Sequence, residues 1–231
     1  MGVVYDELGL FPKAADLLSK AAEVRTRALG PDHPDTLWTR NMLGAVYEHL
    51  GRNEDAAKLY REAMEGRRRV LGPDHRDTIF SMNNVATAFE NEGKIPEAEA
   101  MYRDAIERSA RVLGKDAPGT LFTQYSLGHL LLNAQRDAEA EAVFRELVAA
   151  RRRVLGADNP ETLRAMRGLA SSLQHLKRYD EAEKLFRETL EAMTRVLGPD
   201  HTSTLACREY LGLTIVREGR FDEGLEMMRA S

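Results

Sequence analysis

Apolar residues along the chain follow helical spacing in successive segments that are separated by short polar turns. One segment carries apolar residues every three or four positions from Leu37 to Leu50, and the next does so from Ala56 to Val70. This spacing places the apolar side chains on one face, so each segment predicts an amphipathic helix. The stretch GRNED at 51–55 lies between them and predicts a turn. Two helices joined in this way form a helical hairpin.

The hairpin recurs at a fixed interval of 42 residues. The stretch LGPDHPDTL at 29–37 reappears in related form with its first residue at Leu71, Leu113, Leu155 and Leu197. A fixed period of this length is the signature of a repeat architecture, in which neighbouring units bury a shared core. We therefore expect twelve helices, two from each of six whole or partial units.

The repeated stretch predicts the end of one helix and the start of the next. Gly30 is suited to the position after a helix C-terminus. Asp32 is a good N-cap for the following helix, and Pro34 fits its first turn, where a missing N–H does no harm. We expect this junction in every unit.

Aligned copies show which positions are set by packing. Small residues fill one first-helix column, which reads Gly2, Gly44, Ala86, Gly128, Ala170 and Gly212. A second-helix column is also small and reads Ala14, Ala56, Ala98, Ala140, Ala182 and Gly224. A third column is large and apolar: Leu18, Tyr60, Tyr102, Phe144, Phe186 and Met228. Small residues let two helices approach closely, so we expect the large side chains to fill the space beside them.

These columns resemble the signature of the tetratricopeptide repeat (TPR), through Leu43-Gly44, Tyr47, Ala56, Tyr60 and Ala63. The usual repeat has about 34 residues. The longer unit with LGPDHPDTL as its junction looks like the kinesin light chain class of TPR. The resemblance implies an all-α fold, a right-handed superhelix (α-solenoid) of antiparallel helix pairs, and a protein-interaction scaffold. It also implies a concave groove lined by the first helix of each pair.

We expect a single array over residues 1–231, with partial repeats at 1–28 and 197–231. Full repeats are expected at 29–70, 71–112, 113–154 and 155–196. The chain opens within a first helix and stops within a second one, so we expect a fragment of a longer protein. Its terminal apolar faces, at 1–5 and 225–228, are then expected to pack on something, most simply another copy.

Composition narrows the class of protein. Of the 231 residues 43% are hydrophobic and 30% are charged, which is typical of an ordered, soluble chain. The net charge of −4 gives no general attraction to nucleic acid or to an anionic membrane. The single cysteine excludes an internal disulfide. We find no signal peptide and no apolar run long enough to span a membrane, and we expect a cytoplasmic protein.

Site chemistry in the sequence points to binding rather than catalysis. There is no P-loop, dinucleotide fingerprint, HExxH or GxSxG motif. His33, His75 and His201 share one column, which spaces them too far apart to bind one ion. Cys207 is expected to pack inside a helix layer. We expect no enzyme, metal or cofactor, and we interpret the arginine runs at 67–69 and 151–153 as cations that favour helix C-termini.

The expected peptide-binding groove is read from the exposed positions of the first helices. Its residues are Trp38, Asn41, Phe80, Asn83, Asn84, Phe122, Tyr125, His129, Asn133, Arg164, Arg167 and His175. Asparagine side chains suit a peptide backbone, and the two arginines suit an acidic segment of a protein or peptide partner.

Two alternatives remain open from the sequence. The aromatic residues Trp38, Phe80 and Phe122 either line the groove or wedge between repeats as core. The array as a whole is either a peptide-binding adaptor or a structural spacer or self-association module of a larger multidomain signalling protein.

Overall fold

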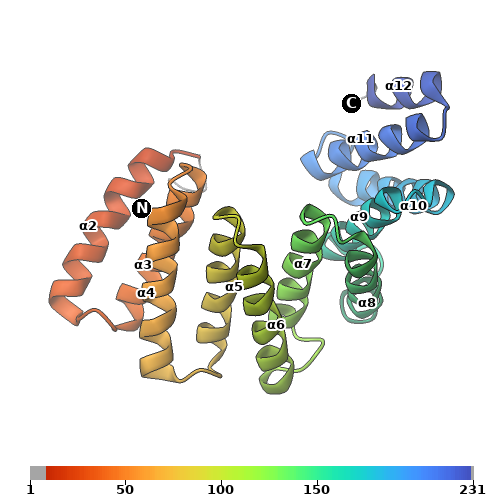
Figure 1. Cartoon of the computed structure of the whole chain (residues 1–231). Helices are drawn as coiled ribbons and strands as arrows, with labels where there is room; N and C mark the ends of the chain where they lie inside the picture. The colour runs from red at the N-terminus through yellow and green to blue at the C-terminus, as the bar shows by residue number, and fades with distance from the viewer. Residues whose placement is uncertain (1–8, 230–231) are drawn as a thin grey trace. The chain divides into compact units, whose positions relative to one another are not determined.

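The chain is built from helix pairs, as the repeat predicts. The computed structural model describes residues 9–229, and over this range it contains eleven helices and no strand (Figure 1). The helices are Phe11–Leu29 (α2), Pro34–His49 (α3), Asn53–Leu71 (α4), Arg76–Asn91 (α5), Ile95–Val112 (α6), Pro118–Asn133 (α7), Asp137–Leu155 (α8), Pro160–His175 (α9), Tyr179–Leu197 (α10), Thr202–Arg217 (α11) and Phe221–Arg229 (α12). The first of the twelve expected helices falls on residues 1–8, outside the described range. The all-α class and the array of helix pairs are confirmed.

Two compact units make up the chain, residues 1–123 and residues 124–231. In the first unit, α3 packs on α2 and α4, and α5 packs on α4 and α6. In the second unit, α9 packs on α8 and α10, and α11 packs on α10 and α12. Each first helix of a pair therefore lies against the second helices before and after it.

The junction between units is held by its own hydrogen bonds. Gly30 ends α2 with φ at 96°, a left-handed conformation that glycine adopts without strain. The Thr36 hydroxyl donates to the Gly30 carbonyl at 2.9 Å, which folds the loop back on itself. The same threonine-to-glycine bond recurs in the later copies at Thr78, Thr120 and Thr162.

The helix cap is one residue later than the sequence predicted. His33 is the N-cap of α3, and its Nδ1 accepts a hydrogen bond from the Asp35 backbone N–H at 3.2 Å. Asp32, which we expected to cap, instead forms a two-pronged ion pair with the Arg69 guanidinium at 2.6 and 3.0 Å. The equivalent caps in later copies are His75, Asn159 and His201. This column of histidines therefore has a structural role at helix starts.

Packing between the helices of a pair follows the small and large columns. The alanine column Ala56, Ala98, Ala140 and Ala182 is fully buried, as predicted. A Cβ placed on Gly44 would lie 2.7 Å from the Tyr60 ring, and one on Gly212 would lie 2.5 Å from Met228 Cγ. In these two pairs the large side chain therefore rests directly on the glycine backbone.

An alanine at Gly128 is expected to destabilise the second unit. Its Cβ would lie 2.7 Å from the Phe144 ring, which is itself fully buried. We expect a net loss of about 1–3 kcal/mol in unfolding free energy, because overpacking outweighs the better helix propensity of alanine. Urea unfolding followed by circular dichroism measures it. Gly119→Ala is the control, since its Cβ meets nothing nearer than Ser109 Oγ at 3.9 Å; equal effects of the two variants would contradict the packing argument.

Candidate functional site

Three aromatic side chains are displayed at the start of successive first helices in the first unit. Trp38 on α3, Phe80 on α5 and Phe122 on α7 are 42%, 49% and 44% exposed. We call these three residues the aromatic face. Large aromatic side chains are usually buried to a greater extent, so three exposed ones at the same repeat position form a candidate binding surface.

The aromatic face is exposed because the preceding position already fills the core. Leu37, Ile79 and Leu121 come directly before the three aromatics and are almost completely buried. Successive helix positions point about 100° apart, so burial of one residue turns the next one outward. These three side chains are therefore not core residues wedged between repeats, which was the alternative.

Predicted groove asparagines lie deeper than the aromatic face. Asn41 and Asn83 are only 3% and 4% exposed, and the half-buried Asn84 donates from Nδ2 to Asn41 Oδ1 at 2.7 Å. That bond joins the middles of α3 and α5. Asn83 Oδ1 is buried without a hydrogen-bond partner. Asn41, Asn83 and Asn84 thus form part of the layer beneath the surface.

In the second unit, Tyr125 and His129 of α7 form an aromatic cluster with Phe144 of α8. The Tyr125 and His129 rings meet edge to face with centroids 4.5 Å apart, and each ring also contacts Phe144. The Arg164 guanidinium lies 5.1 Å from the centroid of the Tyr125 ring, within the range of a cation–π contact. The structure therefore brings together three of the predicted site residues, Tyr125, His129 and Arg164.

His129 is held in its neutral form by this environment. Burial lowers the pKa of His129 to about 4, and the charges of Arg167 and Arg164 contribute in the same direction. Its Nε2 is buried with no hydrogen-bond partner. Neutral imidazole beside two guanidinium groups leaves the cluster with net positive charge.

The remaining predicted residues differ in whether another side chain already pairs with them. Arg164 forms an ion pair with Glu161 at 3.0 Å, and exposed His175 has Nδ1 2.9 Å from Asp137 Oδ1. Half-buried Arg167 has neither a carboxylate within ion-pair distance nor a hydrogen-bond acceptor among the described residues. Asn133 is exposed near the end of α7. Of the two arginines predicted for the groove, Arg164 therefore has its charge paired within the described residues and Arg167 does not.

Sequence reasoning missed the role of two buried arginines. Arg67 is 8% exposed and donates to Ser81 Oγ at 2.6 Å and to the Asp77 carbonyl, both on the next first helix. Arg151 repeats this arrangement with the Glu161 carbonyl at 2.6 Å. We had interpreted both as helix-end cations, but they join one helix pair to the next. The sequence does contain a sign of this role, because Arg25 occupies the same repeat position as Arg67 and Arg151.

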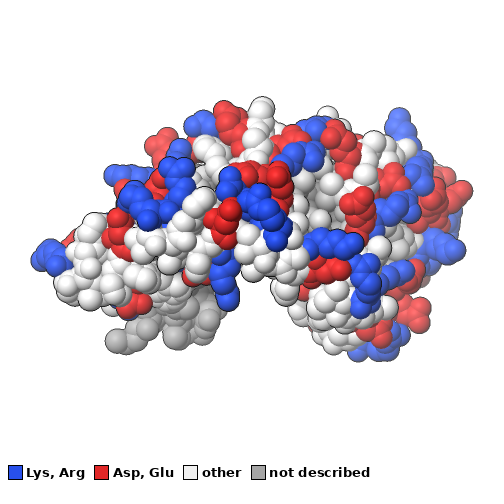
Figure 2. Space-filling view, turned by 90° about the horizontal axis from the view of Figure 1, so that it is seen from below, with Lys and Arg blue, Asp and Glu red and all other residues white. Residues whose placement is uncertain are grey.

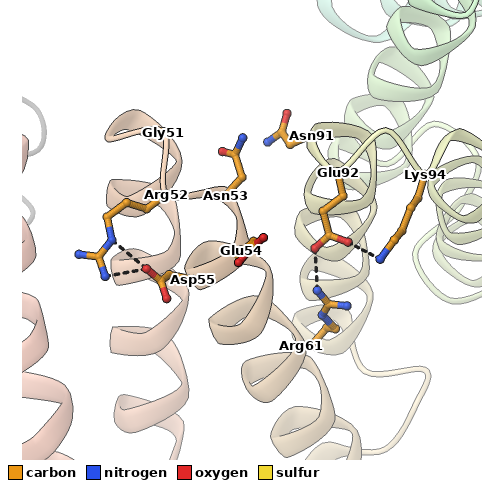
Figure 3. A pocket seen from close by; sticks show the side chains of 9 residues that line it. All are labelled: Gly51, Arg52, Asn53, Glu54, Asp55, Arg61, Asn91, Glu92 and Lys94. Carbon is orange, nitrogen blue, oxygen red and sulfur yellow. Dashed lines mark hydrogen bonds and ion pairs between the residues drawn. The ribbon is translucent and has the colours of Figure 1, made fainter.

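One recess in the described part of the first unit lies at its hairpin turns. It has a volume of about 870 Å³ and is lined by Gly51, Arg52, Asn53, Glu54, Asp55, Arg61, Asn91, Glu92 and Lys94 (Figure 3). Arg52 pairs with Asp55, while Arg61 and Lys94 both pair with Glu92 (Figure 3). These charges satisfy one another, so the recess offers little to a charged ligand.

The face seen in Figure 2 gives no sign of a nucleic-acid interface. In the view of Figure 2, positive and negative side chains of the described residues lie intermixed, without a continuous area of one sign on that face. Many of the arginines form ion pairs with nearby acids, such as Arg187 with Glu183 and Arg220 with Glu223. Sequence-independent binding to nucleic acid needs a basic stripe or patch, which this face lacks.

The single cysteine of the chain is a core residue. Cys207 is fully buried, and burial raises the pKa of its thiol to about 12, so it is a packed side chain as predicted. Between residues 9 and 229, no three His, Cys, Asp or Glu side chains lie together as metal ligands. None of the helices in that range is long and apolar enough to cross a bilayer.

Family models match most of the chain. The family model described as tetratricopeptide repeat matches residues 1–68, 41–111, 82–153 and 161–231. A second tetratricopeptide-repeat model matches residues 125–194. No curated protein matches the chain.

Solved structures with the same fold include kinesin light chain-like repeats. A Podosopora anserina protein, described as a candidate kinesin light chain with nearly identical TPR-like repeats, is 21% identical with a TM-score of 0.73, and the match covers 84% of this chain and 92% of that one. BtubC (BKLC) from P. vanneervenii is 17% identical with a TM-score of 0.79, over 95% and 89% of the two chains. A Rap protein complexed with Competence and Sporulation Factor is 13% identical with a TM-score of 0.69, over 99% and 70%. At these identities the likeness is one of fold.

Proposed function

Because the chain belongs to the tetratricopeptide-repeat family, we propose that it is an adaptor that holds an extended peptide, or a segment of a partner protein, on the exposed surface of its first helices. The family is generally one of non-enzymatic interaction scaffolds. The observation that carries the proposal is the aromatic face of Trp38, Phe80 and Phe122. The complex of the structurally similar Rap protein gives the proposal support by analogy of fold.

An acidic part of the partner is proposed to bind in the second unit at Arg167. This guanidinium is half-buried and lies in a cluster whose histidine is neutral. A carboxylate placed there would gain a charge-assisted hydrogen bond in a partly desolvated site. Arg164 contributes less, because Glu161 already neutralises it.

The proposal is tested by capturing a partner with the intact chain and titrating it against variants. Phe80→Ala removes the most exposed ring of the aromatic face, and Val112→Ala on second helix α6 is a matched control with similar exposure. We expect Phe80→Ala to weaken binding at least tenfold and Val112→Ala to leave it unchanged. Equal affinity of Phe80→Ala and the wild type would show that the partner binds elsewhere.

Charge reversal at Arg167 tests the acidic part separately. Arg167→Glu removes the cation and sets a like charge against the ligand, so we expect a loss of about 2 kcal/mol, about thirtyfold in affinity. Arg68→Glu is the control, since Arg68 is exposed on second helix α4. Isothermal titration at two salt concentrations measures both variants. A loss with Arg68→Glu but not with Arg167→Glu would place the anion on the second helices.

The second candidate function is self-association through the last helix. Phe221 and Leu225 of α12 are 62% and 44% exposed, and they lie four residues apart on one helix face. An apolar face of this kind favours contact with another protein surface. Molecular mass that rises with concentration, and stays constant in a Phe221→Ser variant, would support a self-association module. The other terminal face that we expected to associate, at residues 1–5, lies outside the described range.

A further inference from the structure

Two rows of side chains run across the first helices of the first unit, one aromatic and one acidic. Asp35 and Asp77 lie three residues before Trp38 and Phe80, so each carboxylate is a neighbour of its aromatic ring along the same helix face. Both carboxylates are more than half exposed. The surface around the rings is therefore acidic on one side.

The charged groups around these carboxylates neutralise them only in part. His33 Nδ1 lies 3.9 Å from the Asp35 carboxylate, and His75 Nδ1 lies 3.9 Å from that of Asp77. Both imidazoles accept a backbone N–H at Nδ1, as expected of the neutral form. Arg76, which is strongly exposed, lies 3.5 Å from Asp77. Asp77 also interacts electrostatically with buried Arg67, and Arg25 donates to the Asp35 backbone carbonyl at 3.2 Å. Both carboxylates nevertheless remain exposed to a partner.

The spacing between the rings is set by α3 and α5, which both pack on α4. Side-chain hydrogen bonds join α3 to α5, from Asn84 to Asn41 at 2.7 Å and from Asn91 to Glu48 at 2.8 Å. Long side chains bridge the two helices, so their axes lie about 10 Å apart, at the upper end of the range for neighbouring helices. Because Trp38 and Phe80 occupy the same position of the repeat, their rings are separated by about one helix spacing. Phe122 continues the row at the start of α7.

An extended peptide covers that distance in three residues. A polyproline II chain advances about 3.1 Å per residue with three residues per turn, so three residues span about 9 Å and return the side chain to the same face. A helical partner would need about seven residues for each step, at about 1.5 Å per residue. The row is one aromatic side chain wide on each helix, which suits a narrow extended chain better than a helix about 10 Å across.

We propose that the aromatic face binds an extended basic–apolar peptide segment, in which apolar side chains recur every third residue and lysine or arginine lies between them. The apolar side chains contact Trp38, Phe80 and Phe122, and the basic ones pair with Asp35 and Asp77. This inference rests on the proposed function and specifies its ligand in the first unit. It adds a cationic segment to the acidic one assigned to Arg167.

The single tryptophan of the chain provides the measurement. Trp38 belongs to the aromatic face, so an apolar side chain that covers it is expected to shift its emission to shorter wavelength. Three synthetic peptides of ten residues are titrated into the intact chain. The first has leucines at every third position with lysines between them. The second has the same numbers of leucines and lysines, with its leucines at alternate positions from one end and the remaining lysines at the other. The third is the first peptide with glutamate in place of lysine.

We expect the first peptide to bind at least tenfold more tightly than either of the others. We also expect Asp35→Asn with Asp77→Asn to weaken the first peptide three- to tenfold and to remove most of its salt dependence. Val70→Ala, at an exposed apolar position on α4, is the control and should bind all peptides as the wild type does. Equal affinity for the first two peptides would overturn the spacing, and equal affinity for the lysine and glutamate peptides would overturn the charge.

Failure of this inference is distinguishable from failure of the proposed function. If a captured partner loses binding in Phe80→Ala while none of the three peptides binds, the aromatic face is a binding site but the basic–apolar pattern is wrong. If Phe80→Ala has no effect on the captured partner and the first peptide leaves Trp38 emission unchanged, both are wrong.

Discussion

Replacement of Arg151 by alanine is expected to lower the unfolding free energy of the second unit by about 3 kcal/mol, within the range for breaking a buried charged contact. The Arg151 side chain is almost completely buried, and it donates to the Glu161 carbonyl at 2.6 Å. Its guanidinium also lies 5.2 Å from the centroid of the Tyr125 ring. Alanine would remove all of these contacts between α7, α8 and α9 and leave a cavity.

Two further variants identify the cause of that loss. Arg152→Ala removes the next residue, whose side chain is 41% exposed and pairs with Glu188, so we expect a loss of less than about 1 kcal/mol. Arg151→Met keeps most of the side-chain volume, and methionine already occupies this repeat position at the fully buried Met193. We expect Arg151→Met to cost clearly less than Arg151→Ala. Urea unfolding measures all three, and equal losses for Arg151→Ala and Arg152→Ala would show that burial of Arg151 contributes nothing.

Acid is expected to destabilise the second unit through His129 as pH falls from about 6.5 to about 4. The folded-state pKa of His129 is about 4, below the ordinary value of 6.5, because burial and nearby arginines disfavour the imidazolium. Between these two values the unfolded chain binds a proton that the folded chain does not. The stabilisation is therefore fully present above pH 6.5 and is lost towards pH 4, by up to about 3 kcal/mol.

A His129→Gln variant separates this effect from that of the carboxylates. Carboxyl groups also take up protons in acid, so the informative quantity is the difference between wild type and variant in urea unfolding at pH 7, 5.5 and 4.5. We expect the wild type to lose more stability than His129→Gln over this range. His49→Gln, at an exposed histidine on α3, is the control and should follow the wild type. Parallel curves for wild type and His129→Gln would contradict the assigned cause.

Repeat period and packing columns were predictable from the sequence because both depend on residues at fixed local spacing. The buried alanine column and the small-against-large contacts, such as Gly44 on Tyr60, follow from which positions stay small in every copy. The helix cap was predicted one residue early, since Asp32 and His33 both have acceptors suited to that role. The choice between them depends on Arg69, which is distant in sequence and binds Asp32.

The candidate site was less predictable, because exposure depends on neighbouring helices. The helical pattern places Asn41 near the exposed positions, yet α5 lies against it and Asn84 binds it. Arg151 looks like an ordinary surface cation in the sequence, and only the position of the Glu161 carbonyl explains its burial. The sequence alone does not decide whether the rings of the aromatic face are core or surface, because an aromatic side chain occurs in both places.

The junctions between helix pairs also bear on how such a chain can change its length. Each junction contains its own turn glycine, and the four that begin at Leu29, Leu71, Leu113 and Leu155 each add the threonine bond that closes the loop. Deleting or duplicating one whole period of 42 residues within 29–112 would rejoin two copies of the same connector, with all its bonds intact. A gene that encodes such a chain can therefore lengthen or shorten its product by unequal recombination, and each event changes the number of binding positions without redesigning a turn.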